Sequence, residues 1–111
     1  MQATVRRWGP VVAWAALIFA LSSVPGLGTG LGVWDLVLRK LAHATEFAIL
    51  AALLVRAVRD PRWAIAIGVL YAVSDEIHQS FVAGRHGAPL DVLIDSAGVV
   101  VGALLASRIW R

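Results

Sequence analysis

Cysteine is absent from the 111 residues of this chain, so disulfide bonds and thiolate metal sites are both excluded. Charged residues are also scarce: they make up 15% of the sequence, against about 25% in typical soluble domains. Hydrophobic residues make up 59%. A chain this short cannot bury that much apolar surface in one water-exposed core. The composition therefore favours a single-domain membrane protein over a very hydrophobic soluble bundle.

Long polar stretches are missing as well, and four apolar segments follow one another along the chain. They cover residues 8–24, 36–58, 63–82 and 89–109, with glycine, proline and aspartate at the breaks. Each is close to the roughly 20 residues that a helix needs to cross a bilayer. The sequence therefore predicts an all-α fold, a small bundle of four transmembrane helices.

The first apolar segment has a second interpretation. The two arginines before it and its short apolar run are also typical of a cleavable signal peptide. We prefer a retained helix because the apolar run continues to Val24.

Basic residues are missing from the predicted first loop, and Arg85 is alone in the third. The termini and the second loop hold most of the others: Arg6, Arg7, Arg56, Arg59, Arg62, Arg108 and Arg111. Cytoplasmic loops of membrane proteins carry an excess of lysine and arginine. Both termini and the second loop are therefore predicted to be cytoplasmic. The net charge of +3 therefore comes from basic residues at the ends of the segments. Because membrane proteins use basic residues in this way, we expect no nucleic-acid partner.

Ionisable and amide side chains interrupt three of the four apolar segments. They are Lys40, His43 and Glu46, then Asp75, Glu76, His78 and Gln79, then Asp91 and Asp95. At about 1.5 Å per residue, all three groups fall in the same outer half of the predicted bundle. A charge near the bilayer centre costs about 2.5–3.5 kcal/mol, and buried ion pairs seldom repay their desolvation. A functional site is therefore favoured over a salt-bridge network that only fixes helix register.

The residue types suggest roles within one site. His43 and His78 are candidate general acids or bases, with Glu46 or Asp75 to orient the ring, and Glu76 completes the candidate catalytic set. The candidate substrate-binding residues are Lys40, Gln79, Arg85, Asp91 and Asp95; among these, the lysine and the arginine suit a phosphate or carboxylate. The histidines and carboxylates are also suitable ligands for a divalent metal, although no H-E-x-x-H motif is present.

The last apolar segment carries a stripe of small and acidic residues. Asp91, Asp95, Gly98 and Gly102 recur at intervals of four, three and four, so they share one helical face. The two glycines form a small-xxx-small pair, which predicts close packing against a neighbouring helix. Such packing directs both aspartates into the bundle.

Three groups of residues resemble the VanZ-like family of membrane proteins. They are Phe19-Ala20-Leu21-Ser22-Ser23 followed by Pro25; Lys40-Leu41-Ala42-His43 followed by Glu46-Phe47; and Ser74-Asp75-Glu76 with His78-Gln79, Phe81, Gly84-Arg85, Asp91 and Asp95. The resemblance covers most of the chain, taken as one domain over residues 1–111. It implies a multi-pass protein of the bacterial cytoplasmic membrane. The family is named after a protein associated with resistance to the glycopeptide teicoplanin, and no reaction follows from the name.

Three functions of different classes are compatible with these features. The leading hypothesis is a polar site on the extracytoplasmic side that binds or processes an envelope lipid or lipid-linked cell-wall precursor, with a link to glycopeptide tolerance. The alternatives are a proton or ion relay or small transporter, and a non-catalytic partner that stabilises another envelope protein. Membrane lipids are the expected partners, and a homo-oligomer is compatible with the sequence. Whether the protein is an enzyme is left open.

Overall fold

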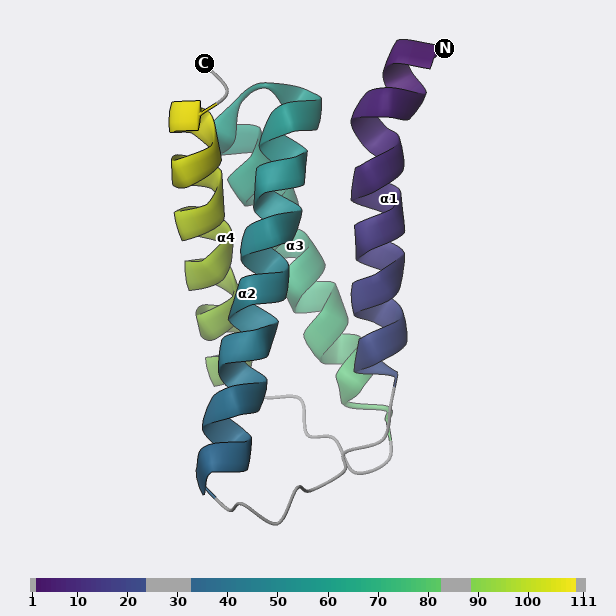
Figure 1. The fold of residues 1–111 in the computed structure, drawn as a ribbon. Helices are drawn as coiled ribbons and strands as arrows, with labels where there is room; N and C mark the ends of the chain where they lie inside the picture. Colours follow the sequence, from purple (N-terminus) through teal and green to yellow (C-terminus); the bar gives the residue numbers. More distant parts are fainter. Residues whose placement is uncertain (1, 24–32, 83–88, 110–111) are drawn as a thin grey trace.

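The chain forms four helices that run alternately up and down (Figure 1). This computed structural model describes residues 2–23, 33–82 and 89–109. The helices are α1 (Gln2–Ser22), α2 (Val33–Val58), α3 (Pro61–Gln79) and α4 (Pro89–Ile109). The start of α1, the end of α4 and the α2–α3 connection lie at one end of the bundle (Figure 1). The predicted all-α fold of four helices is confirmed, and no strand occurs in the described ranges.

Two of the helices are long and apolar enough to cross a membrane. They are Val37–Val58 of α2 and Pro89–Ile109 of α4, and only 33% of each most apolar window is buried inside the protein. A core helix of a soluble protein would be mostly buried, whereas large side chains such as Leu41, Leu93 and Leu104 are exposed here. Two candidate spans therefore stand where the sequence predicts four. The other two spans and the membrane orientation stay predictions.

The ends of three helices differ by three residues or more from those predicted from apolarity, and one of them is α2, which begins at Val33 instead of residue 36. α1 begins at Gln2 instead of residue 8 because its basic first turns are helical as well as polar. α3 ends at Gln79 instead of residue 82. After it, the backbone N–H groups of Phe81 and Val82 donate to the carbonyls three residues earlier, at 3.1 and 3.0 Å. Such tight bonds satisfy the last carbonyls of a helix without extending it.

The glycines of α4 bring its backbone against that of α2. A Cβ atom on Gly98 would lie 2.3 Å from the carbonyl oxygen of Ala44, and one on Gly102 would lie 2.1 Å from that of Ala48. Only glycine allows so close an approach. The prediction that this face packs against a neighbouring helix is confirmed, and the neighbour is α2.

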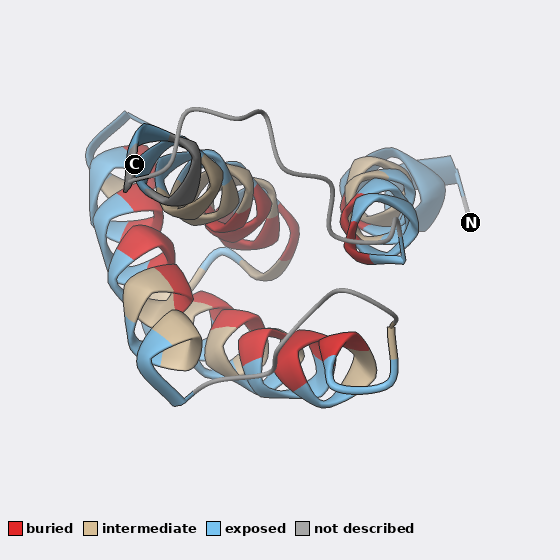
Figure 2. Cartoon of the chain, turned by 90° about the horizontal axis from the view of Figure 1, so that it is seen from below, coloured by how far each residue is buried: buried red, intermediate tan, exposed pale blue. Residues whose placement is uncertain are grey.

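The interior is divided into an apolar half and a polar half. The fully buried hydrophobic side chains of Leu50, Leu54 and Ala64 lie toward the end of the bundle that holds the α2–α3 connection. The buried polar residues lie toward the opposite end: Ser22, Asp75, Glu76, Gln79 and Asp95. Figure 2 shows the buried residues on the inward faces of the helices. The fold thus gathers its buried polar groups at one end.

Two hydrogen bonds from side chains to backbone carbonyl groups hold α1 against α2 and α3. The indole Nε1 of Trp14 donates to the carbonyl of Glu46 at 2.9 Å, and the hydroxyl of Tyr71 donates to the carbonyl of Ala15. Within the described ranges α1 contacts α2 and α3 but not α4, and it stands to one side of the other three helices (Figure 2). Trp14 had no role in the sequence interpretation.

Asp60, which precedes Pro61, caps the start of α3. Its carboxylate accepts hydrogen bonds from the backbone N–H of Arg62 at 2.9 Å and from the Arg62 guanidinium at 3.1 Å. The side-chain hydrogen bond from Arg62, helped by the backbone one, holds the pKa of Asp60 below its ordinary value. Pro61 at the first position loses no hydrogen bond there.

This cap predicts a pH dependence. Because the pKa of Asp60 is lower in the folded state, its contribution is fully present above the unfolded-state pKa and is lost as pH falls through the folded-state pKa. Asp60→Ala should slightly lower the unfolding temperature in detergent at neutral pH and weaken its decline in acid. Asp60→Asn keeps the capping acceptor, so it should lose mainly the acid dependence. Identical pH profiles from about pH 3 to pH 7 for all three proteins would contradict this role.

Candidate functional site

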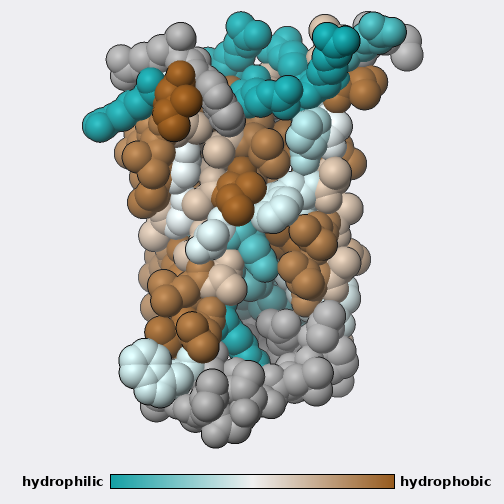
Figure 3. Space-filling view, in the orientation of Figure 1, coloured by the Kyte–Doolittle hydropathy of each residue, from teal (hydrophilic) through white to brown (hydrophobic). Residues whose placement is uncertain are grey.

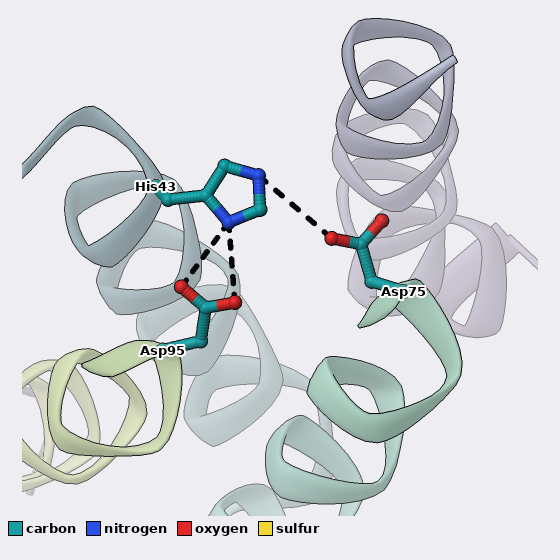
Figure 4. Close-up of side chains that lie close together, drawn as sticks. All are labelled: His43, Asp75 and Asp95. Atoms are coloured by element: carbon teal, nitrogen blue, oxygen red, sulfur yellow. Dashed lines mark hydrogen bonds and ion pairs between the residues drawn. The ribbon is translucent and has the colours of Figure 1, made fainter. Parts of the chain in front are cut away.

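His43 of α2 lies between a carboxylate of α3 and a carboxylate of α4. Its Nδ1 is 3.2 and 3.1 Å from the two carboxylate oxygens of Asp95. Its Nε2 is 3.8 Å from Oδ2 of Asp75. Figure 4 shows the two carboxylates at the two nitrogens of the ring, and one ligand atom from each residue lies within 4.8 Å of the others. We call these three residues the His43 cluster.

The cluster forms because three helices place their residues at one level. At about 1.5 Å per residue, His43 lies about 15 Å from the start of α2 and Asp95 about 9 Å from the start of α4. Asp75 lies about 6 Å before the end of α3, which runs the opposite way. The close α2–α4 contact at the glycines then brings His43 and Asp95 within hydrogen-bond distance.

Both carboxylates of the cluster are removed from solvent, whereas the imidazole is partly accessible. Asp75 is 2% and Asp95 1% exposed, and the His43 side chain is 18% exposed. Asp95 receives the His43 hydrogen bond, but neither carboxylate oxygen of Asp75 has a hydrogen-bond partner among the described residues. A buried carboxylate without hydrogen bonds is costly. Asp75 is therefore the group whose environment is least satisfied.

Gln79 completes the surroundings of the ring. Its side chain is buried, and its Nε2 lies 3.2 Å from Nε2 of His43. When Nδ1 of a neutral imidazole donates to Asp95, Nε2 carries the lone pair. The Gln79 amide can then donate to that lone pair. The contacts thus agree with one tautomer of His43.

A second pair connects the same two helices one turn away. Lys40 of α2 forms an ion pair with Asp91 of α4, and their side chains are 30% and 21% exposed. Figure 3 shows hydrophilic side chains in a recess between hydrophobic ones, between α2 and α1. The lysine therefore places a positive charge beside the His43 cluster at a more accessible level.

His78 lies against α1 instead of the imidazole of His43. Its ring stacks on Phe19 with centroids 4.1 Å apart and an interplanar angle of 11°. Its Nε2 is 3.3 Å from the hydroxyl of Ser23. The structure therefore separates the two histidines that the sequence nominates for the same acid–base role.

The two candidate glutamates occupy different positions, one near the imidazole and one in a groove between helices. Glu46 is half-buried three residues after His43, and the ring's hydrogen-bonded carboxylate is Asp95, not Glu46 or Asp75 as expected. Glu76 lines a groove of about 540 Å³ between α3 and α4, with Val73, Ile77, Ser80, Pro89, Val92 and Leu93. Arg85, predicted to bind substrate, lies outside the described residues.

Ser22 is a polar neighbour of the cluster that sequence reasoning missed. It is 1% exposed, and its hydroxyl lies near enough to Asp75 to interact with it, although the contact falls outside ordinary hydrogen-bond geometry. The sequence places it in a serine pair at the end of an apolar run, where a serine is ordinarily a helix-end residue. Nothing in that pattern indicates that it turns inward.

The sequence as a whole was compared with known proteins. It matches the VanZ/LLP1 family profile over residues 3–111, which include the His43 cluster and the Lys40–Asp91 pair. Searches of curated proteins and of solved structures gave no match. The resemblance seen in the polar motifs thus extends over nearly the entire chain, and the protein belongs to the VanZ/LLP1 family.

Proposed function

We propose that this protein spans the bacterial cytoplasmic membrane four times and binds or processes an envelope lipid or lipid-linked cell-wall precursor in its polar half. The observation that carries the proposal is His43 held between Asp75 and Asp95 inside a chain with an apolar exterior. Ionisable groups within membrane segments are costly and usually mark a functional site. The apolar surroundings favour a lipid as the ligand.

Helix length and charge support the proposed topology. α1 has 21 residues and α3 has 19, which correspond to about 31 and 28 Å against a hydrocarbon core of about 30 Å. The basic ends of the helices gather at the end of the bundle where α1 starts and α4 ends. By the positive-inside rule this end is cytoplasmic. The His43 cluster, in the other half, then faces the extracytoplasmic side.

Lys40 is the residue best placed to recognise an anionic headgroup. Its ammonium is partly exposed and is paired with Asp91, so a phosphate can compete with that carboxylate for it. Arg85, which precedes the first residue of α4 by four positions in the sequence, is the second candidate. The His43 cluster then contacts the polar part of the lipid while its apolar chain stays in the bilayer.

A proton relay is the second candidate, because an imidazole between two carboxylates can pass protons. A relay needs ionisable groups along the whole membrane. In the described part of the chain, the buried polar residues all lie in one half, and the other half is filled by side chains such as Leu50 and Leu54. Lipid binding therefore fits the distribution of charge better.

The proposal predicts that Lys40→Gln weakens binding of anionic envelope lipid. Loss of one charge-assisted hydrogen bond is worth about 1.5–3 kcal/mol, so the affinity should fall about tenfold or more. The measurement is binding of fluorescent undecaprenyl phosphate to the purified protein in detergent. Arg62→Gln, which removes a positive charge at the other end of the bundle, is the matched control and should bind as wild type does.

Two outcomes would count against this function. One is that wild type and Lys40→Gln bind the phosphorylated lipid equally well, and that wild type binds a non-phosphorylated lipid alcohol equally well. The polar site would then not recognise the lipid headgroup. A cellular phenotype that survives the double variant His43→Ala/Lys40→Gln would favour the third class, a non-catalytic partner of another envelope protein.

A further inference from the structure

We infer that His43 Nε2, the Asp75 carboxylate and the Gln79 amide oxygen form a site for a first-row divalent cation such as Zn²⁺ or Mn²⁺. Asp95 holds the imidazole and is not a ligand. The inference rests on the proposed function for what the cation does, since it would face the lipid headgroup. Cation binding itself is measured without any lipid.

Asp95 prepares His43 as a ligand. Both of its carboxylate oxygens lie at 3.1–3.2 Å from Nδ1, so the N–H at Nδ1 donates a hydrogen bond to Asp95 and, in the neutral ring, Nε2 carries the lone pair. Metal-ligating histidines almost always donate their other ring N–H to a carboxylate, carbonyl or water in this way. The hydrogen bond fixes both the tautomer and the direction of the ring.

Asp75 is the second and decisive observation. It is 2% exposed, and its buried carboxylate oxygens form no hydrogen bond of ordinary geometry among the described residues, with the Ser22 hydroxyl as a weaker polar neighbour. It points at the Nε2 edge of the ring (Figure 4). An imidazole lone pair and a carboxylate that face each other inside a protein repel. A cation between them removes the repulsion and gives the carboxylate a partner.

The distances suit a cation after a small movement. Nε2 and Oδ2 of Asp75 are 3.8 Å apart. Two ligands with bonds of about 2.0–2.1 Å in tetrahedral geometry are separated by about 3.3–3.4 Å. A side-chain shift of a few tenths of an ångström, or a wider ligand angle, closes the difference.

Gln79 supplies the third ligand when its amide turns. Its amide nitrogen lies 3.2 Å from Nε2 of His43, and a half-turn about the last side-chain bond exchanges nitrogen and oxygen. The amide oxygen then faces the same position. Three protein ligands leave at least one coordination site for water or a phosphate oxygen, the arrangement that catalytic metal sites keep.

The ligand types select the class of cation. One imidazole with two oxygen ligands suits zinc or manganese better than calcium or magnesium, which prefer oxygen alone. A chain without cysteine offers no thiolate for softer ions. A divalent cation here would neutralise and polarise a bound phosphate.

The test is metal binding by the full chain, purified in detergent with a tag that contains no histidine. Wild type should bind one Zn²⁺ or Mn²⁺ per chain by calorimetry and metal analysis. His43→Ala and Asp75→Asn should lose binding, and Asp95→Asn should bind about 10–100-fold more weakly because the imidazole loses its anionic partner. Asp60→Asn, which changes an aspartate at the other end of the bundle, should bind as wild type does.

Stability in chelator separates this site from a structural ion pair. Without metal, Asp75→Asn should unfold at the same or a higher temperature than wild type, because it removes a buried charge without hydrogen bonds. A lower unfolding temperature in chelator, with wild-type metal content no greater than that of Asp75→Asn, would overturn the inference in favour of an imidazolium between two carboxylates. If the wild-type protein binds the metal but does not bind the envelope lipid, only the function proposed above would be overturned.

Discussion

The variant Gly98→Ala/Gly102→Ala is expected to destabilise the bundle strongly, by about 1–3 kcal/mol per site or more. The added Cβ atoms would lie 2.3 and 2.1 Å from carbonyl oxygens of α2, far inside van der Waals contact. These neighbours are backbone atoms, so no side-chain rotation relieves the overlap and α4 must move away from α2. The measurement is the unfolding temperature in detergent, followed by the loss of monodisperse protein on heating.

Two other glycines provide matched controls. A Cβ on Gly9 would meet nothing closer than a methyl group of Val5 at 4.0 Å, so Gly9→Ala should be neutral or slightly stabilising within its helix. Gly68→Ala would meet side-chain methyl groups of Val99 at 2.7 and 3.0 Å, which can shift, so its effect should be intermediate. Equal unfolding temperatures for the Gly9 and Gly98/Gly102 variants would contradict the close α2–α4 packing.

The fold could be predicted from sequence where one signal dominates. Apolar length gave four helices, and the spacing of Gly98 and Gly102 gave the packed face of the last one. Periodicity identifies a face but not its partner, which is why α2 emerged as that partner only in three dimensions. The start of α1 was missed because apolarity does not register a helical turn made of basic residues.

The candidate site was predictable in depth and less so in contacts. Counting residues along antiparallel helices placed His43, Asp75 and Asp95 at one level, and the structure brings these three together. The exact partner of the ring depends on how each helix is rotated about its axis. A rotation of α4 by a few tens of degrees decides whether Asp95 reaches Nδ1, and a sequence does not contain that angle.

The contribution of α1 was the least predictable part of the site. Trp14, Ser22 and Phe19 contact the other helices through a hydrogen bond, a buried hydroxyl and a stacked ring. α1 is apolar on most of its surface, so no polar stripe marks its inward face. A single inward serine and two aromatic residues look the same in sequence whether they face lipid or protein.

Asp95→Ala is expected to lower the free energy of unfolding by about 1.5–3 kcal/mol, the worth of a hydrogen bond to a charged group. The variant removes the only hydrogen-bond partner of Nδ1 of His43 in the described part of the chain and leaves the imidazole facing a small void. If the two residues act as a pair, adding His43→Ala should cost less in the Asp95→Ala background than in wild type. A double-mutant cycle measured by denaturant unfolding in mixed micelles should give a coupling energy of about 0.5–3 kcal/mol.

Two further variants decide what the coupling means. Asp91→Ala changes an aspartate of the same helix, but its partner Lys40 has a long flexible side chain that can extend to the membrane surface, so the loss should be smaller. Asp95→Asn keeps an oxygen that accepts a hydrogen bond from the Nδ1–H group and should retain most of the stability while it loses the negative charge. A protein that is nearly as stable as wild type yet weaker in binding its ligand would show that Asp95 serves the site through its charge. Equal losses for Asp95→Asn and Asp95→Ala would instead make the charge itself the source of stability, and the His43–Asp95 pair a structural contact between α2 and α4.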